Sequence, residues 1–203
     1  MENVAAVEHG NSSETNTGIS HHKLGMLVFI TSEIMFFGGL IGSYVVFRFG
    51  NANWNPPAGV EIPFLLPLIN TLLLVTSSFT LHFAEGHLFK GNQSGFKNWL
   101  LFTVLLGTTF LTIQGIEYSH LYHEGMVLGG PEGTLFGASF YVLTGFHGLH
   151  VTGGVIYLLF IYLTAFKGKH TAENHFHVEM GSTYWHFVDI VWIFLFTILY
   201  VIK

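Results

Sequence analysis

The chain has 203 residues, of which 50% are hydrophobic and only 9% are charged. This balance exceeds what a water-soluble domain could bury in one core, so it indicates an integral membrane protein. The sequence has no cysteine, which excludes disulfides and thiolate chemistry, and its seven scattered Lys and Arg residues exclude a basic patch for nucleic acid.

The chain begins with a polar segment, residues 1–23, rich in Asn, Ser, Thr and Glu. This segment has neither the basic start nor the short apolar core of a signal peptide. We expect a mobile polar tail over 1–23 and one transmembrane domain over 24–203.

Five apolar stretches follow, and each reaches the roughly 20 residues needed to cross about 30 Å of hydrocarbon. The fourth runs for 33 residues without Asp, Glu, Lys or Arg, so it predicts one long, tilted or protruding span. Connectors rich in Gly, Pro and Asn separate the stretches. The predicted fold is an all-α integral membrane protein, a bundle of five transmembrane helices over 24–47, 62–83, 99–118, 134–166 and 183–202.

Basic residues near the span ends predict the orientation, because they favour the cytoplasmic side of a membrane. Five lysines fall on one side of the predicted bundle and two basic residues on the other. The amino terminus is therefore predicted to be cytoplasmic and the carboxyl terminus to lie outside. The first group is Lys23, Lys90, Lys97, Lys167 and Lys169, and the second is Arg48 and Lys203.

Glu33 is a carboxyl group in the middle of the first predicted span. It follows Lys23 by ten residues, about 15 Å along a helix axis. An ionised carboxylate at that depth costs roughly 2.5–3.5 kcal/mol. We expect Glu33 to face protein, either neutral or hydrogen-bonded to a neighbouring helix; a direct role in proton transfer is the alternative.

Two further polar groups lie inside predicted spans. Counting inward from the flanking lysines places Glu117, His147 and His150 in one outer layer, which predicts a hydrogen bond between Glu117 and one of the two imidazoles. His186 and Asp189 are three residues apart, on one helical face near the inner end of the fifth predicted span. We expect a local imidazole and carboxylate pair there.

Small and aromatic residues in the spans have packing explanations. Glycines in the fourth span predict close approach of another helix, and aromatic residues near span ends predict the belt found at membrane interfaces. The glycines are Gly145, Gly148, Gly153 and Gly154; the aromatic residues are Trp54, Trp99, Tyr118, Tyr184 and Trp185.

The strongest alternative from another class is a membrane di-iron oxygenase or desaturase. Glu117 and His120 fit a Glu-x-x-His motif, and His120 with His123, like His147 with His150, resembles a histidine box. A carboxylate di-iron bundle needs two such motifs and two further glutamates, and this sequence offers one motif. We therefore expect no catalytic residue, no cofactor and no metal on this chain, and iron content would separate the two hypotheses.

Several strings, in family order, give the chain a resemblance to subunit III of cytochrome c oxidase. The resemblance covers residues 24–202, and the last two strings are its most specific part. The strings are GM at 25–26, SEIMFF at 32–37, WNPP at 54–57, NT at 70–71, QGIEY at 114–118, TGFHGLHV at 144–151 and YWHFVDIVW at 184–192.

The resemblance implies a non-redox subunit of a proton-pumping haem-copper terminal oxidase, an enzyme of the translocase type. It implies that this chain packs beside catalytic subunit I, with subunit II in the same complex, and supports proton uptake and stability. Haem and copper are then expected on the partner subunits. Glu33, Glu117, His147, His150, His186 and Asp189 become buried polar groups of functional or structural importance.

Some implications of the resemblance stay open. The longer family form has two more helices that enclose a lipid cleft, so bound phospholipid is an open alternative for a five-span chain. Short five-helix forms also occur in quinol oxidases, although the WNPP string and Glu33 favour the cytochrome c branch. The expected location is a bacterial plasma membrane or an internal energy-converting membrane.

Overall fold

The computed structural model describes residues 21–52, 54, 56–57, 60, 62–129 and 134–202. Within these ranges the chain forms five long helices, each long and apolar enough to cross a membrane, so the predicted all-α fold is confirmed. A π-helical turn, η1, extends the last of them. The elements are α1 His21–Gly50, α2 Leu65–Phe89, α3 Gln93–His123, α4 Leu135–Ala165, α5 Phe176–Phe196 and η1 Thr197–Val201.

The helices mostly extend beyond the predicted apolar stretches. The long fourth stretch is one helix, α4, as predicted. The largest difference is in α5, which begins at Phe176, seven residues before the predicted start at 183. The added segment contains His177 and Glu179. These polar residues interrupt the apolar pattern of the sequence, but the helix continues through them. The predicted tail lies outside the described residues up to position 20, and residues 21–23 belong to α1.

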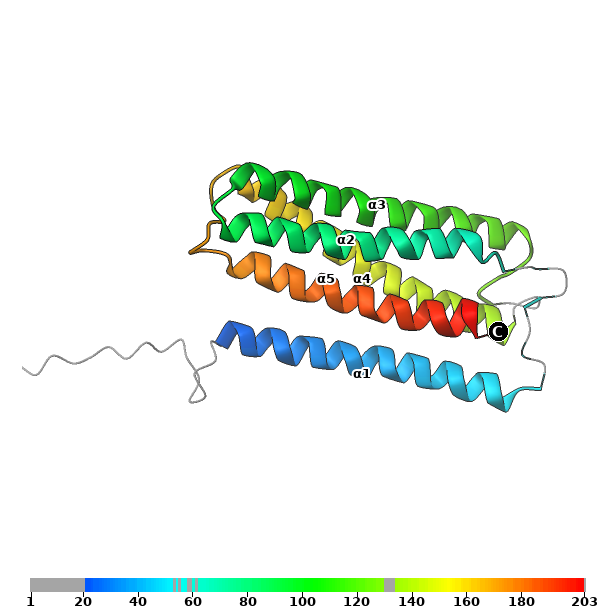
Figure 1. Ribbon diagram of the computed structural model, residues 1–203. Coiled ribbons are helices and arrows are strands. Elements are labelled where there is room, and N and C mark those ends of the chain that lie inside the picture. The colour runs from blue at the N-terminus through cyan, green and yellow to red at the C-terminus, as the bar shows by residue number, and fades with distance from the viewer. Residues whose placement is uncertain are drawn as a thin grey trace, which may run out of the picture.

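The helices run antiparallel to their chain neighbours and lie side by side (Figure 1). Helices α2 to α5 form a bundle in which α3 packs on α2 and α4, and α5 packs on α2 and α4. Helix α1 lies along one edge against α4 and α5. This arrangement suits lipid, because each helix satisfies its own backbone hydrogen bonds.

Glycines in the left-handed region end three of the helices. Gly91, Gly125 and Gly168 have φ of +73°, +94° and +67° and follow α2, α3 and α4. A residue without Cβ adopts this conformation at little cost, which makes it the usual helix stop. The side chains of Asn92 and Thr134 accept backbone N–H groups at the starts of α3 and α4. The turns between helices are therefore encoded locally.

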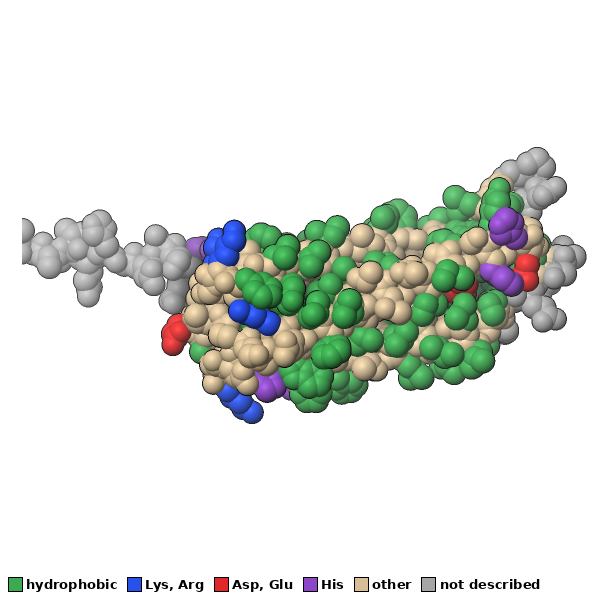
Figure 2. All heavy atoms as spheres, turned by 90° about the horizontal axis from the view of Figure 1, so that it is seen from above, with side chains coloured by type: hydrophobic (Ala, Val, Ile, Leu, Met, Phe, Trp, Pro, Cys, Tyr) green, Lys and Arg blue, Asp and Glu red, His purple; other side chains and the backbone are tan. Residues whose placement is uncertain are grey.

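Basic side chains gather at one end of the molecule, where α2 and α4 end and α3 and α5 begin (Figure 2). We call it the lysine end, because Lys23, Lys90, Lys97, Lys167 and Lys169 are all at the helix termini that meet there. Arg48 is in the last turn of α1, at the opposite end. Lys203 lies outside the described residues. The predicted cytoplasmic orientation of the amino terminus stays a prediction.

The core of the bundle is built around Trp185. A Cβ placed on Gly107 of α3 would lie 2.6 Å from the Trp185 ring, and one on Gly154 of α4 would lie 2.8 Å from it. Gly154 is thus closely packed against α5, but its neighbours there are aromatic side chains and not the backbone whose close approach was predicted. The prediction that Trp185 joins an interfacial belt is wrong. Because α5 begins earlier than expected, Trp185 lies deep in the bundle, where its Nε1 donates to Ser77 Oγ at 2.9 Å.

Candidate functional site: polar contacts between the helices

Glu33 of α1 and His150 of α4 form a hydrogen-bonded pair. The Glu33 Oε2 and His150 Nε2 atoms are 2.9 Å apart, and both side chains are 18% exposed. This confirms the prediction that Glu33 bonds to a neighbouring helix. His150 Nδ1 lies 2.7 Å from the Phe146 carbonyl oxygen, which can only accept, so Nδ1 carries a proton. The Glu33–His150 bond then requires one further proton, held by either the carboxyl group or Nε2.

Glu117 and His147 take other partners than predicted. The buried Glu117 carboxylate accepts a hydrogen bond from the Tyr200 hydroxyl of η1 at 2.9 Å. His147 Nε2 donates to the Val188 carbonyl oxygen of α5 at 3.3 Å. With His150 bonded to Glu33, the predicted bond between Glu117 and an imidazole is wrong.

This prediction failed because it measured depth in the membrane from Lys97 and Lys167, which are not at equivalent positions in their helices. Lys97 is inside α3, which begins at Gln93, whereas Lys167 lies beyond the end of α4 at Ala165. Both helices can be counted from the lysine end. Glu117 lies 24 residues from the start of α3, whereas His150 lies only 15 residues from the end of α4. The difference of nine residues is about 13 Å of helix rise.

His186 and Asp189 meet through a residue that the sequence analysis missed. The hydroxyl of Ser78 on α2 donates to Asp189 Oδ2, and His186 Nδ1 lies 3.0 Å from the same hydroxyl oxygen. Asp189 is thirteen residues from the start of α5 at Phe176, about 20 Å along the helix. The prediction that the pair lies near the inner end of its span is therefore wrong: Asp189 is midway along the helical segment 176–201.

Another polar contact holds the far end of α1. The Arg48 guanidinium donates to the Ile202 carbonyl oxygen at 2.5 Å and to the Ile198 carbonyl oxygen at 3.5 Å. The Tyr44 hydroxyl also donates to the Ile198 oxygen, at 3.1 Å. A cation is favourable at this point, because the carbonyl groups at a helix C-terminus carry partial negative charge.

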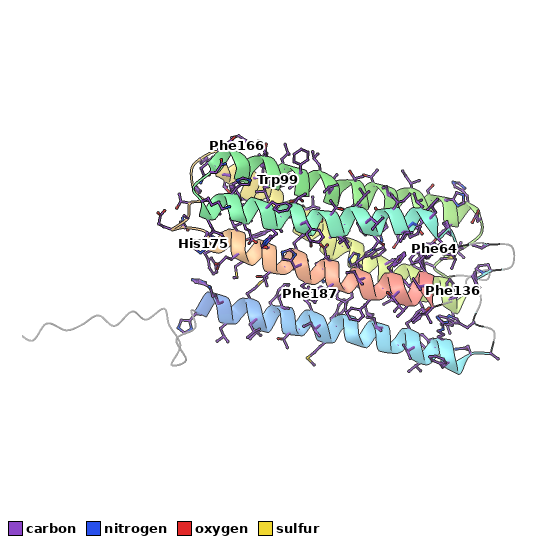
Figure 3. The ribbon with its side chains drawn as sticks, viewed as in Figure 1. Phe64, Trp99, Phe136, Phe166, His175 and Phe187 are labelled. Atoms are coloured by element: carbon purple, nitrogen blue, oxygen red, sulfur yellow. The ribbon has the colours of Figure 1, made fainter. Side chains whose placement is uncertain are left out.

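Few apolar residues of α1 are fully buried between these polar contacts. The Phe187 ring of α5 points toward α1, where its centroid is 6.4 Å from that of Phe37 (Figure 3). Phe37 and Tyr44 are the buried residues of α1. Ile30, Leu40 and Ile41 are partly buried against the core, and most of the other apolar side chains of this helix are exposed.

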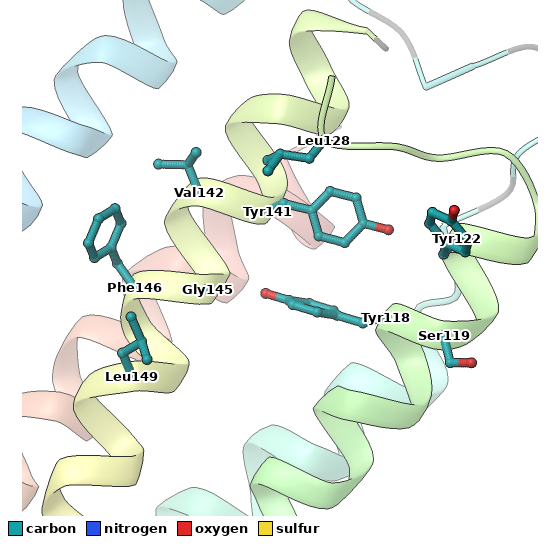
Figure 4. A pocket seen from close by; sticks show the side chains of 9 residues that line it. All are labelled: Tyr118, Ser119, Tyr122, Leu128, Tyr141, Val142, Gly145, Phe146 and Leu149. Atoms are coloured by element: carbon teal, nitrogen blue, oxygen red, sulfur yellow. The ribbon is translucent and has the colours of Figure 1, made fainter. Parts of the chain in front are cut away.

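A groove of about 610 Å³ opens between α3 and α4 (Figure 4). Tyr118 and Tyr141 extend into it from the two helices, with ring centroids 5.0 Å apart. Their hydroxyl groups bond within the chain, to Thr144 Oγ1 at 2.5 Å and to the Met126 carbonyl oxygen at 2.9 Å. The lining is otherwise mainly apolar, so the groove suits an acyl chain better than a polar substrate.

The histidines do not assemble into a metal centre over the described ranges. In that part of the chain no group of three or more His, Asp or Glu side chains lies close enough to hold a metal ion. His120 faces Glu124, one turn away, at 3.5 Å. His147 and His150 point to different partners, as described above. The Glu-x-x-His motif and the two histidine boxes therefore do not converge.

Comparison with known proteins identifies relatives along nearly the whole chain. Residues 4–203 match the family described as Cytochrome c oxidase subunit III. A Thermostichus vulcanus protein named cytochrome c oxidase subunit 3 is 41% identical over 180 residues, covering 88% of this chain and 86% of that protein. A probable cytochrome c oxidase subunit 3 of Nocardia farcinica is 40% identical, covering 89% and 87%. A Synechocystis protein named cytochrome c oxidase subunit 3 is 37% identical, covering 88% of this chain and 74% of that protein.

Proposed function

The chain belongs to the cytochrome c oxidase subunit III family, and from this premise we propose that it packs beside subunit I of a proton-pumping oxidase, supporting proton uptake and stability. Membership of the family makes it an integral membrane subunit of a haem-copper oxidase. Haem and copper belong, in this proposal, to the partner subunits, with subunit II in the same complex. The electron donor is cytochrome c, because WNPP and Glu33 match that branch; a quinol is the second candidate.

The observation that carries the proposal is the way the buried polar groups are used. Glu33, Glu117, His147 and Asp189 each contact another helix of the same chain, and each bonds to a different partner. A redox enzyme would gather such groups around one cofactor. Polar contacts distributed in this way support a subunit that shapes and stabilises a complex while electron transfer takes place elsewhere.

Purification of the complex through a tag placed after Lys203 tests the proposal. We expect a large haem-bearing chain to co-purify and the complex to oxidise reduced cytochrome c. A complex prepared without this chain should begin turnover normally and then lose activity sooner. Isolation of the chain alone with one iron per chain would contradict the proposal, and oxidation of a quinol but not of cytochrome c would select the second donor.

We propose that the lysine end faces the cytoplasm of a bacterial plasma membrane or an internal energy-converting membrane. The asymmetry of basic residues supports this orientation. In sealed vesicles of known sidedness, protease should remove the tag after Lys203 only from the outer face. Removal from the cytoplasmic face alone would reverse the orientation.

A further inference from the structure

Polar side chains on the facing sides of α2 and α5 form a regular pattern. Both helices carry them at successive spacings of three and four residues, which keeps them on one helical face. The helices are antiparallel, so the two sets meet in three rungs that we call the polar ladder. From the lysine end inward, the rungs are Glu85 with Ser182, His82 with His186, and Ser78 with Asp189.

The ladder opens into a cavity at the lysine end. This cavity of about 510 Å³ lies between α1, α2 and α5, and Glu85, Ser182 and His186 all line it. Lys23 of α1 and Glu179 of α5 line it as well, with 3.3 Å between the Lys23 Nζ and Glu179 Oε2 atoms. Unlike the groove between α3 and α4, this cavity has several charged and polar side chains among its lining residues and room for several water molecules.

The inner end of the ladder is a directed chain of hydrogen bonds. Ser78 has one hydroxyl proton and donates it to Asp189 Oδ2. The contact of 3.0 Å between Ser78 Oγ and His186 Nδ1 must then be donated by the imidazole. His186 Nε2 remains as the acceptor of the ring. The chain thus runs from the imidazole through the hydroxyl to the carboxylate.

Asp189 is the last group of this hydrogen-bond chain. Its side chain is 5% exposed, and its Oδ1 atom has no hydrogen-bond partner among the described residues. From α4, His147 Nε2 donates to the carbonyl oxygen of Val188, the residue before Asp189 in the chain. Packing alone does not need this arrangement, because Trp185 and Trp192 already bond α5 to Ser77 and Thr71 of α2.

We propose that the polar ladder is a proton inlet, through which water at the lysine end delivers protons to Asp189 for storage inside the membrane. This inference specifies how the chain would support proton uptake, and it rests on that proposed function. A proton from water adds to His186 Nε2, and the imidazolium releases its Nδ1 proton to Ser78 Oγ. Ser78 passes its own proton to Asp189 Oδ2, so the carboxylate becomes a neutral acid. The starting tautomer returns when the His186 ring exchanges protons with water in the cavity, losing the proton on Nε2 and taking one up on Nδ1.

Infrared spectroscopy of the intact complex tests the inlet without an electron donor. The Asp189 carboxyl band is identified by its loss in Asp189→Asn, at a pH where the wild-type band is fully developed. After transfer to heavy water, the rate at which this band shifts measures proton exchange. We expect Glu85→Gln and His186→Gln to slow the exchange about tenfold or more, as the loss of a hydrogen-bonded transfer step predicts.

Thr183→Val is the matched control, because Thr183 lines the same cavity while its hydroxyl bonds to the Glu179 carbonyl oxygen of its own helix. This variant should exchange at the wild-type rate. Equal exchange rates in the wild type, Glu85→Gln and His186→Gln would overturn the inlet, even if the chain co-purifies with the haem-bearing subunit. Failure to co-purify would instead overturn the proposed function, and the exchange rates would still decide whether the ladder conducts.

Discussion

Helix α1 and the bundle of α2 to α5 are held in place by different kinds of contact. In the most apolar 18-residue stretch of α1 only 6% of residues are buried, whereas in that of α5 half are. The bundle fits aromatic rings against glycines, while α1 is fixed by polar contacts at three levels: Lys23, Glu33 and Arg48. Lipid tails are as apolar as leucine, so apolar surface alone gives a peripheral helix little reason to dock.

The largest effect is expected from overfilling the bundle at Gly154. The Gly154→Ala change would place a methyl group 2.8 Å from the Trp185 ring, which Gly107 confines on its other side. We expect a loss of about 1–3 kcal/mol of stability, the usual cost of overpacking, measured by thermal unfolding of the purified complex. Gly153→Ala is the adjacent control, since its Cβ would lie 3.8 Å from the Tyr184 hydroxyl. Equal stability of the two variants would show that the Trp185 ring can move.

A smaller effect is expected when α1 loses its central contact. Glu33→Leu leaves His150 Nε2 without its partner, whereas Glu33→Gln keeps a polar side chain of the same shape. At about 0.6–1.7 kcal/mol for such a bond in a membrane, the ratio of docked to undocked α1 should fall roughly threefold to eighteenfold in Glu33→Leu and much less in Glu33→Gln.

The absence of native cysteine makes this docking measurable. The Phe36 and Phe146 rings of α1 and α4 have centroids 5.2 Å apart, so a cross-linker with two thiol-reactive groups should join Phe36→Cys to Phe146→Cys when α1 is docked. The yield of this cross-link should fall in Glu33→Leu, while thermal unfolding of the bundle stays near the wild type. An unchanged cross-linking yield would mean that apolar contacts suffice to hold α1.

The smallest effect is expected at His170, in the connector between α4 and α5. His170 is buried, and its Nε2 lies 2.7 Å from Thr164 Oγ1. Burial, followed by the nearby charges of His177 and Lys169, lowers the pKa of His170 below its ordinary value of about 6.5. The folded connector then binds fewer protons than the unfolded one, so its stability is present above about pH 6.5 and is lost as the pH falls further.

Proteolysis of this connector should therefore speed up as the pH is lowered from 7 through 6, with a protease whose own activity is constant over that range. His170→Gln should flatten the dependence, because the amide does not titrate in this range. A pH dependence that persists in His170→Gln would assign the effect to another group.

Sequence reasoning located the spans because hydropathy is a local property, but it failed where position depended on neighbouring helices. Glu33 was expected to bond to another helix because of its depth alone, and it does. The partner of Glu117 depended on how far α3 extends beyond Lys97, which no local pattern encodes. Ser78 was not singled out, because one serine within an apolar span is no signal by itself. Its spacing from His82 and Glu85, matched on α5, is the signal that could have found it.

The hydrogen bonds from Arg48 to the carbonyl oxygens of Ile198 and Ile202 can form only late in the synthesis of the chain. Arg48 belongs to the first helix, but the carbonyl groups that it binds lie 150 and 154 positions later, at the end of the last one. Because synthesis proceeds from the amino terminus, α1 enters the membrane long before this contact can form. The partner of Glu33 also appears late, at position 150. Helix α1 therefore cannot make these contacts until the residues around positions 150, 198 and 202 have been synthesised.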